Sequence, residues 1–334
     1  MSGQRLVHQY DPTVGYRFVP DLRARLDNDE AGYLLRTNGS GFRCEHEFVE
    51  RKTPGITRIL LFGDSFTAGD SVSNRDRYGD CLERLLPGIE VYNFGLSGSG
   101  TDQQYLVWRE IGSRYEHDIV VLGVLVENVR RVAARFREAA SRDGRRVVMA
   151  KPYFTLEDGK LVLHHVPVPR DPIAEDALSP AERGHVDHGG RFQWLRSAVT
   201  KLGGGAKDSI QRLTRYQPLP AYDDSGNSDW LLMKAILKQW VQEIRVPVVV
   251  CPIPLYQYVE GTASPEGYRA RFGELEGWPR VVVHDPLSDF HRVPEVHRRQ
   301  LRFQRDVHLT PEGHRILAES LARAISPLLA RRNG

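Results

Sequence analysis

The chain has 334 residues, of which 40% are hydrophobic and 27% are charged, and its formal net charge is +3. This length is sufficient for one large α/β domain with insertions, or for two small domains. The charge is too small to predict a nucleic-acid-binding protein, and no stretch approaches the roughly 20 apolar residues of a membrane span.

Cysteine usage and the N-terminal residues indicate a compartment. The three cysteines, Cys44, Cys81 and Cys251, are far apart in the sequence and odd in number. This pattern argues against a disulfide framework and favours a reducing environment. The first residues contain no apolar segment of the kind found in signal peptides. We therefore expect a cytoplasmic protein.

The expected elements follow in chain order. Residues 1–55 are polar and Gly- and Arg-rich, and we expect an N-terminal extension packed on the main domain. Apolar runs predict strands at residues 56–62, 89–94, 118–126, 246–252 and 281–284. Helical spacing predicts helices at residues 78–86, 102–111, 129–140, 230–244 and 311–329.

This alternation of strands and helices predicts an α/β fold: a three-layer α/β/α, doubly wound parallel sheet. Its core would comprise residues 56–149 and 231–330, and its functional residues would lie at the carboxyl ends of the strands. Residues 150–230 break the pattern and are predicted to be an insertion that forms a lid or cap. Within it, residues 151–168 read as a hairpin, and residues 203–207 read as a flexible link.

Two glycine-containing turns directly follow predicted strands. Gly63, Asp64 and Ser65 come after the first strand, so a serine hydroxyl would lie at the edge of the sheet beside a helix N-terminus, where an oxyanion is favoured. Ser65 could equally cap that helix. The second turn contains Gly95, Gly98 and Gly100, whose backbone N–H groups could approach a ligand. A flexible connector is the alternative interpretation.

Two further segments carry candidate chemistry. Asn128 follows the third strand and could donate its side-chain amide to an oxyanion, or could cap the next helix. Asp306 and His308 precede the last helix, and in an extended segment residues i and i+2 point the same way. The carboxylate could then fix the tautomer of the imidazole and leave Nε2 free as a base. A salt-bridged surface loop is the alternative.

Together, these four segments resemble the signature blocks of the SGNH hydrolases, the GDSL-type esterases and lipases, which supply Ser, Gly, Asn and His in this order. The resemblance covers residues 56–128 and 281–321. It implies a flavodoxin-like sheet of the SGNH type. The last block here is Asp-x-His rather than the common Asp-x-x-His, and polysaccharide O-acetyltransferases related to this family also carry the shorter spacing.

Carried over residue by residue, the resemblance assigns a catalytic triad and an oxyanion hole. Ser65 matches the nucleophile, His308 the base and Asp306 the residue that orients the base. The oxyanion hole would consist of the backbone N–H groups of Ser65 and Gly98 with the side-chain amide of Asn128.

The implied function is hydrolysis of a carboxylic ester through an acyl-enzyme, with a small O-acyl group on a sugar or glycoconjugate as the expected substrate. The alternatives are an O-acyltransferase that moves an acetyl group to or from a polysaccharide, and a non-catalytic glycan-binding protein on the same fold. No metal or organic cofactor is expected. The partner would be a small-molecule or glycan ester, with no nucleic acid and no membrane span.

Clusters of histidine and arginine could indicate a metal site or a binding site for an acidic glycan, but we expect neither. The histidines at positions 164, 165, 185 and 188 could suggest a metal site, but they lie in the polar insertion without a supporting carboxylate pattern, which argues against one. The basic run that includes Arg131 and Arg137 is predicted to be the solvated face of a helix. Attraction of an acidic glycan is the alternative.

Overall fold

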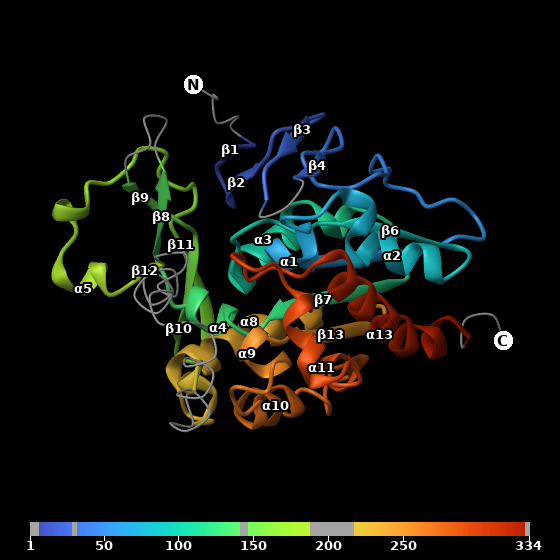
Figure 1. Ribbon diagram of the computed structural model, residues 1–334. Helices are drawn as coiled ribbons and strands as arrows, with labels where there is room; N and C mark the ends of the chain where they lie inside the picture. Colours follow the sequence, from blue (N-terminus) through green and yellow to red (C-terminus); the bar gives the residue numbers. More distant parts are fainter. Residues whose placement is uncertain (1–6, 29–31, 141–145, 188–216, 331–334) are drawn as a thin grey trace.

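The computed structural model describes residues 7–28, 32–140, 146–187 and 217–330 of the chain (Figure 1). The predicted link at residues 203–207 lies outside this part. No helix in the described ranges is both long enough and apolar enough to cross a bilayer.

A five-stranded, all-parallel sheet forms the centre of the molecule, with strand order β14-β13-β7-β5-β6. Its strands are β5 (Thr57–Gly63), β6 (Ile89–Asn93), β7 (Ile119–Leu125), β13 (Val248–Ile253) and β14 (Val281–Val283). Every residue of β7 is buried, as expected for a central strand covered on both faces. The five strands predicted from apolar runs are therefore confirmed.

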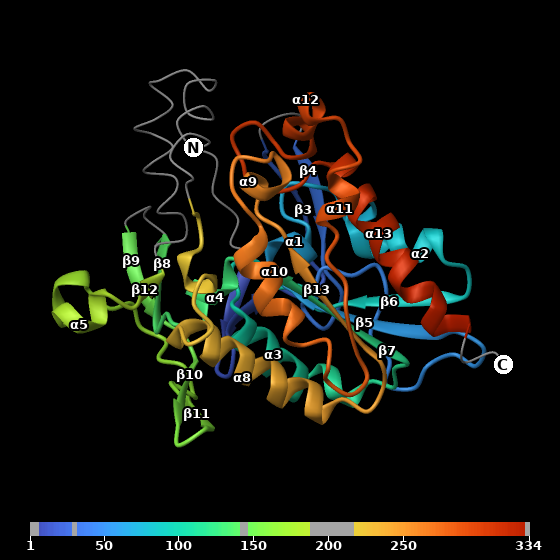
Figure 2. The same ribbon diagram turned by 90° about the horizontal axis from the view of Figure 1, so that it is seen from below.

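Helices cover both faces of this sheet and give the predicted three layers (Figure 2). On one face α2 packs against α13, and on the other α3 packs against α8. The helices of the core are α1 (Ser65–Ala68), α2 (Tyr78–Leu85), α3 (Thr101–Glu110), α4 (Asn128–Arg131), α8 (Ser228–Glu243), α9 (Tyr256–Val259), α10 (Glu266–Gly273), α11 (Leu287–Phe290), α12 (Glu295–Arg298) and α13 (Pro311–Ala330). Short 3-10 helices occur at Asn74–Asp76, Gly112–Arg114, Glu175–Ala177, Pro220–Tyr222 and Arg299–Leu301.

Two small hairpins precede the core, and a separate sheet and a hairpin follow α4. The N-terminal hairpins are β1 (His8–Asp11) with β2 (Gly15–Phe18), and β3 (Arg23–Leu26) with β4 (Tyr33–Arg36). The later elements are β8 (Phe136–Ala140), β9 (Arg146–Ala150), β10 (Tyr153–Glu157), β11 (Lys160–His164), α5 (Pro180–Arg183) and β12 (Val186–Asp187). We call the three-stranded β12-β8-β9 sheet the outlying sheet; it lies beside the core at the left of Figure 1.

The predicted hairpin at residues 151–168 is confirmed as β10–β11, with Asp158 and Gly159 at its turn in the left-handed conformation. It contacts α3 and α8 on one face of the central sheet. Phe154 of β10 is buried there against Tyr105 of α3.

The helix predicted at residues 129–140 is wrong beyond its first turn. Helix α4 ends at Arg131, and the chain enters β8 at Phe136. Long-range pairing outweighs local helix propensity here, because β8 is hydrogen-bonded antiparallel to β9 and parallel to β12. The outlying sheet consequently begins inside the range 56–149 that was assigned to the core.

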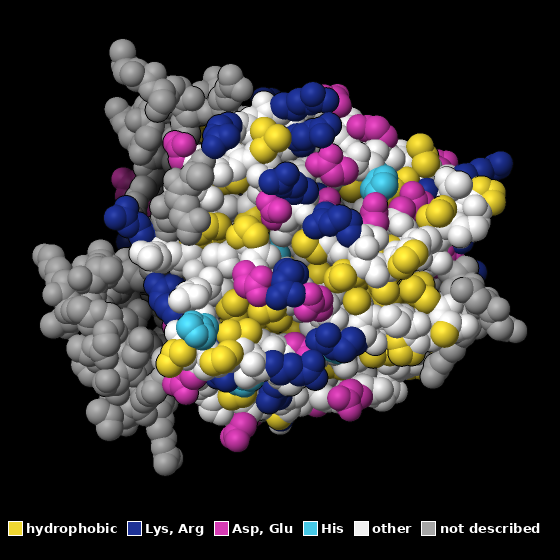
Figure 3. Space-filling view, turned by 45° about the vertical axis from the view of Figure 1, so that its right-hand side comes forward, with side chains coloured by type: hydrophobic (Ala, Val, Ile, Leu, Met, Phe, Trp, Pro, Cys, Tyr) yellow, Lys and Arg dark blue, Asp and Glu magenta, His cyan; other side chains and the backbone are white. Residues whose placement is uncertain are grey.

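The surface carries charges of both signs close together. On the face shown in Figure 3, acidic and basic side chains are interspersed rather than gathered into areas of one sign. This distribution fits the small net charge of +3.

Candidate active site

Ser65 is the first residue of α1, directly after β5. The N-cap of this short helix is Asp64, whose Oδ1 accepts a hydrogen bond of 3.1 Å from the backbone N–H of Phe66. The capping position is therefore occupied by the aspartate, and the serine hydroxyl is not used as a cap. Ser65 is 5% exposed. Among the described residues, its backbone N–H has no hydrogen-bond acceptor.

The glycine-rich turn follows β6, the neighbour of β5 in the sheet. Gly95 packs against α1: a Cβ at this position would lie 2.3 Å from the backbone nitrogen of Ala68. Its N–H donates to Asn93 Oδ1, and that of Gly100 donates to Gln103 Oε1. Gly98 has φ +74°, and within the described residues its N–H has no acceptor. Of the three glycines, Gly98 alone has a backbone donor left for a ligand.

Asn128 begins α4 after β7, the other neighbour of β5. Its side chain is fully buried, and within the described part of the chain neither its Oδ1 nor its Nδ2 has a hydrogen-bond partner. The N-cap of α4 is Glu127, so Asn128 does not cap the helix. Burying an amide without a hydrogen-bond partner costs free energy. Such groups are typically found where a ligand supplies the missing partner.

The segment before α13 brings the predicted acid–base pair together. His308 Nδ1 lies 2.8 Å from Asp306 Oδ1, the contact expected from their spacing of two residues. The imidazole also packs against Phe66, with ring centroids 5.1 Å apart, so it lies beside the first turn of α1. No hydrogen bond joins Ser65 Oγ to the imidazole in the described structure; such contacts are often long in unliganded sites and shorten with substrate.

Ser71, which the sequence analysis did not identify, holds the carboxylate from the other side. Its hydroxyl donates a hydrogen bond of 2.5 Å to Asp306 Oδ2, while Oδ1 accepts from His308 and from the backbone N–H of Val307. Ser71 has φ +71°, a conformation that costs a non-glycine residue free energy. Only the fold brings residues 71 and 306 together, so no local sequence signal could have revealed the contact.

Electrostatics favour a charged aspartate and a basic histidine. Burial opposes ionisation of Asp306, but the hydrogen bonds from His308 and Ser71 outweigh it and hold the pKa of the carboxyl well below its usual range. Burial also lowers the pKa of His308, but the hydrogen bond to Asp306 and the nearby negative charges of aspartates outweigh this effect. The pKa of His308 is therefore raised above its ordinary value. This combination suits a base whose imidazolium must be stabilised.

A buried ion pair connects the turns that carry Ser65 and Gly98. Arg131 Nη1 lies 2.8 Å from Asp64 Oδ2 and 3.2 Å from the backbone oxygen of Ser99. Burial raises the pKa of the Asp64 carboxyl, and the Arg131 charge opposes this effect. The arginine thus joins α4, the glycine-rich turn and the nucleophile turn. The prediction of a solvated helix face is wrong for Arg131.

A second buried pair ties the end of β9 to the same region. Lys151 Nζ lies 2.6 Å from Asp102 Oδ2 at the start of α3. The ammonium also donates to the backbone oxygens of Arg131 and Ala134, at 2.7 Å and 3.1 Å. Lys151 therefore connects the outlying sheet to α3 and to the end of α4.

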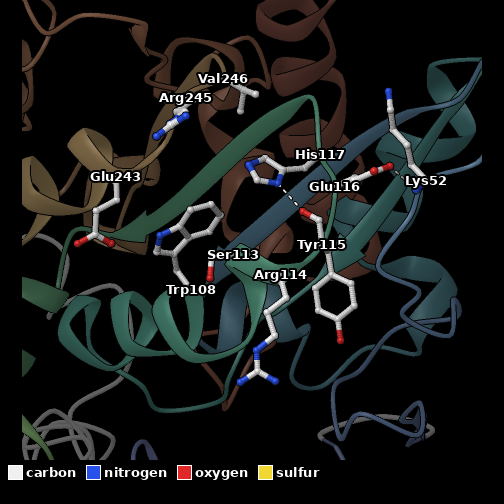
Figure 4. A pocket seen from close by; sticks show the side chains of 10 residues that line it. All are labelled: Lys52, Trp108, Ser113, Arg114, Tyr115, Glu116, His117, Glu243, Arg245 and Val246. Carbon is white, nitrogen blue, oxygen red and sulfur yellow. Dashed lines mark hydrogen bonds between the residues drawn. The ribbon is translucent and has the colours of Figure 1, made fainter.

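A hollow of about 640 Å³ lies at the amino ends of the parallel strands. Figure 4 shows the side chains that line it. It is lined by residues that precede β7 and β13, such as His117 and Val246, together with Trp108 and Glu243 from α3 and α8. Ser65 lies at the carboxyl ends of the same parallel strands. The hollow is therefore separate from the predicted site, and its wide opening does not resemble an enclosed substrate pocket.

Of the histidines considered as metal ligands, His188 lies outside the described residues, and the others make other contacts. His164 Nε2 is hydrogen-bonded to Thr155 Oγ1, and His165 Nδ1 lies 3.2 Å from the backbone oxygen of Lys151. Within the described ranges, no three His, Cys, Asp or Glu side chains are grouped so that they could hold a metal ion.

Comparisons with known proteins give weak structural likenesses. No family model and no curated protein matches the chain. A member of the lipolytic protein G-D-S-L family from Veillonella parvula DSM 2008 is 12% identical, covers 81% of this chain and 98% of its own, and has a TM-score of 0.41. TesA is 11% identical, with coverage of 81% and 99% and a TM-score of 0.43.

The acetyl xylan esterase AlAXEase is similar to a comparable degree, with 15% identity, coverage of 80% of this chain and 99% of its own, and a TM-score of 0.42. At such TM-scores the likenesses carry no argument about activity. The interpretation of the site therefore rests on the side chains described above.

Proposed function

We propose that this chain is a serine-dependent carboxylic ester hydrolase of the SGNH kind. The observation that carries the proposal is the hydrogen-bonded Asp306–His308 pair, placed against the helix that begins at Ser65. The buried amide of Asn128, which has no hydrogen-bond partner among the described residues, supports it, because an oxyanion hole needs a donor that is not already engaged.

The mechanism follows from these positions. His308 Nε2 takes the proton of Ser65 as Oγ attacks the ester carbonyl carbon, while Asp306 stabilises the imidazolium. The carbonyl oxygen becomes an oxyanion that accepts hydrogen bonds from the backbone N–H groups of Ser65 and Gly98 and from Asn128 Nδ2. The imidazolium then protonates the departing alcohol. Water, deprotonated by His308, then attacks the acyl carbon; the bond to Ser65 Oγ breaks, the imidazolium returns its proton to Oγ, and the carboxylic acid leaves.

The substrate that we propose is a small O-acyl group on a sugar or glycoconjugate. A second candidate, transfer of the acyl group to a sugar hydroxyl, is favoured by the short Asp-x-His block, in which a single residue separates Asp306 from His308. Analysis of products with and without added sugar acceptors distinguishes the two reactions, since transfer yields a new ester and hydrolysis yields free acid.

The experiment that tests the proposal is labelling with a fluorophosphonate followed by mass spectrometry of the peptides. We expect the label on Ser65, and we expect Ser65→Ala to lose both labelling and turnover of p-nitrophenyl acetate. Ser326→Ala, which removes an exposed hydroxyl on α13, is the matched control and should retain both. Turnover by a folded Ser65→Ala protein equal to that of the unaltered protein would refute the assignment.

A further inference from the structure

The glycine-rich turn is covered by two side chains from outside the core. Tyr16 of β2 donates its hydroxyl to the backbone oxygen of Ser97 at 2.7 Å. Arg137 of β8 stacks on the tyrosine, with its guanidinium carbon 4.2 Å from the ring centroid. A Cβ built on Gly98 would lie 3.4 Å from Arg137 Nη2 and 3.5 Å from the Tyr16 hydroxyl. The guanidinium is therefore next to the proposed oxyanion donor.

The charge of Arg137 is not neutralised by an ion pair. Arg131 pairs with Asp64, whereas no carboxylate of the described residues lies within ion-pair distance of Arg137. A half-buried guanidinium that is oriented by stacking, and that has no carboxylate partner among the described residues, is suited to bind an anion.

The remaining ionisable neighbours of the turn make contacts of their own, and among the described residues none of them is within ion-pair distance of Arg137. Asp70 accepts a hydrogen bond of 2.6 Å from the Ser97 hydroxyl and faces the turn from the α1 side. His8, whose ring lies 5.3 Å from that of Tyr16, is held neutral, because burial lowers its pKa to about 4. Two cations therefore contact the turn: Arg131, which is paired with Asp64, and Arg137, which reaches it from β8.

We propose that Arg137, stacked on Tyr16, binds a carboxylate on the alcohol part of the substrate, so that the preferred substrate is an O-acylated acidic sugar. This inference rests on the proposed ester hydrolysis. Because the acyl group is small, the part of a bound ester that can extend from the oxyanion hole to Arg137 is the alcohol. The planar guanidinium can donate two parallel hydrogen bonds to a carboxylate, which gives orientation as well as affinity.

The test compares two acetylated oligosaccharides, an acidic oligogalacturonate and a neutral xylo-oligosaccharide. We expect the unaltered protein to have the higher kcat/KM on the acidic ester. Arg137→Gln should reduce the ratio of acidic to neutral kcat/KM by about ten- to a hundredfold, the usual effect of losing hydrogen bonds between charged groups. Arg137→Lys should restore part of that ratio, since the charge remains without the planar fork.

Arg135 provides the matched control. It is also half-buried and also stacks on a tyrosine, Tyr153, with its guanidinium carbon 5.2 Å from the ring centroid. Arg135→Gln should leave the substrate ratio unchanged. An equal loss of ratio in Arg135→Gln and Arg137→Gln, or an unchanged ratio in Arg137→Gln, would overturn the proposal.

A binding experiment separates failure of this inference from failure of the proposed hydrolysis. Calorimetry with unacetylated trigalacturonate requires no turnover, and we expect binding to the unaltered protein that Arg137→Gln weakens about tenfold or more. If no ester is cleaved but this binding is found, hydrolysis is wrong and the acidic-sugar site stands. If esters are cleaved and trigalacturonate binds no better than xylotriose, the acidic-sugar site is wrong.

Discussion

Removal of the Ser71 hydroxyl tests whether the contact to Asp306 supports the base. The hydroxyl donates one of the three hydrogen bonds described above for this carboxylate, at 2.5 Å. A hydrogen bond to a charged group contributes about 1.5–3 kcal/mol, equivalent to roughly ten- to a hundredfold in rate. The Asp306 side chain is 30% exposed, so water can replace part of the lost bond. We therefore expect Ser71→Ala to lower kcat/KM by about tenfold, near the lower limit.

The assay is the pH profile of kcat/KM with p-nitrophenyl acetate. The plateau of Ser71→Ala should fall while its shape persists, because Asp306 keeps its hydrogen bond with His308 and stays ionised near neutral pH. Ser71→Gly is the informative comparison, since glycine removes the hydroxyl and also relieves the positive φ. Its kcat/KM should be as low as that of Ser71→Ala, and its free energy of unfolding should be higher than that of Ser71→Ala. A plateau within twofold of the unaltered protein in both variants would refute a positioning role for Ser71.

Three further predictions follow from the site. Asn128→Leu should lower kcat roughly 10²–10³-fold and should keep or raise the melting temperature, because it replaces a buried amide that has no partner in the described part of the chain; a lower melting temperature with unchanged kcat would contradict this. The acid limb of kcat/KM should have its midpoint above pH 6.5, because the pKa of His308 is raised and only the neutral imidazole accepts a proton; a midpoint below 6 would contradict it. Arg131→Ala should lower the free energy of unfolding by about 3–5 kcal/mol in urea titrations, because it leaves Asp64 buried and unpaired; a loss under about 1 kcal/mol would contradict it.

The central sheet could be predicted from the sequence because its signals are local. Each strand is an apolar run, and Pro311 with Thr310 marks the start of α13, where the Thr310 hydroxyl accepts a hydrogen bond from the N–H of Gly313. The contact between Asp306 and His308 was also predictable, since it depends only on alternation along an extended segment. The catalytic roles of these residues remain predictions.

The features that could not be predicted depend on contacts between distant parts of the chain. From the sequence, Arg131 is predicted to lie on the solvated face of a helix, because nothing local indicates that the fold brings Asp64, 67 positions earlier, beside it. The segment at residues 132–140 has good helix formers, yet Arg135 and Phe136 donate their backbone N–H groups to His185 and the chain continues as a strand. Neither outcome leaves a periodic signal in the sequence.

The buried Lys151 has a consequence for how this protein can be recombined. Exchanging the segment after α4 with that of a relative would separate an ammonium from Asp102, and would leave one of the two charged groups buried alone. The same exchange would remove the donor for the backbone oxygens of Arg131 and Ala134. A chimera that changes substrate preference should therefore contain α3, α4 and the outlying sheet from the same parent protein. The two parent sequences should be joined before the glycine-rich turn.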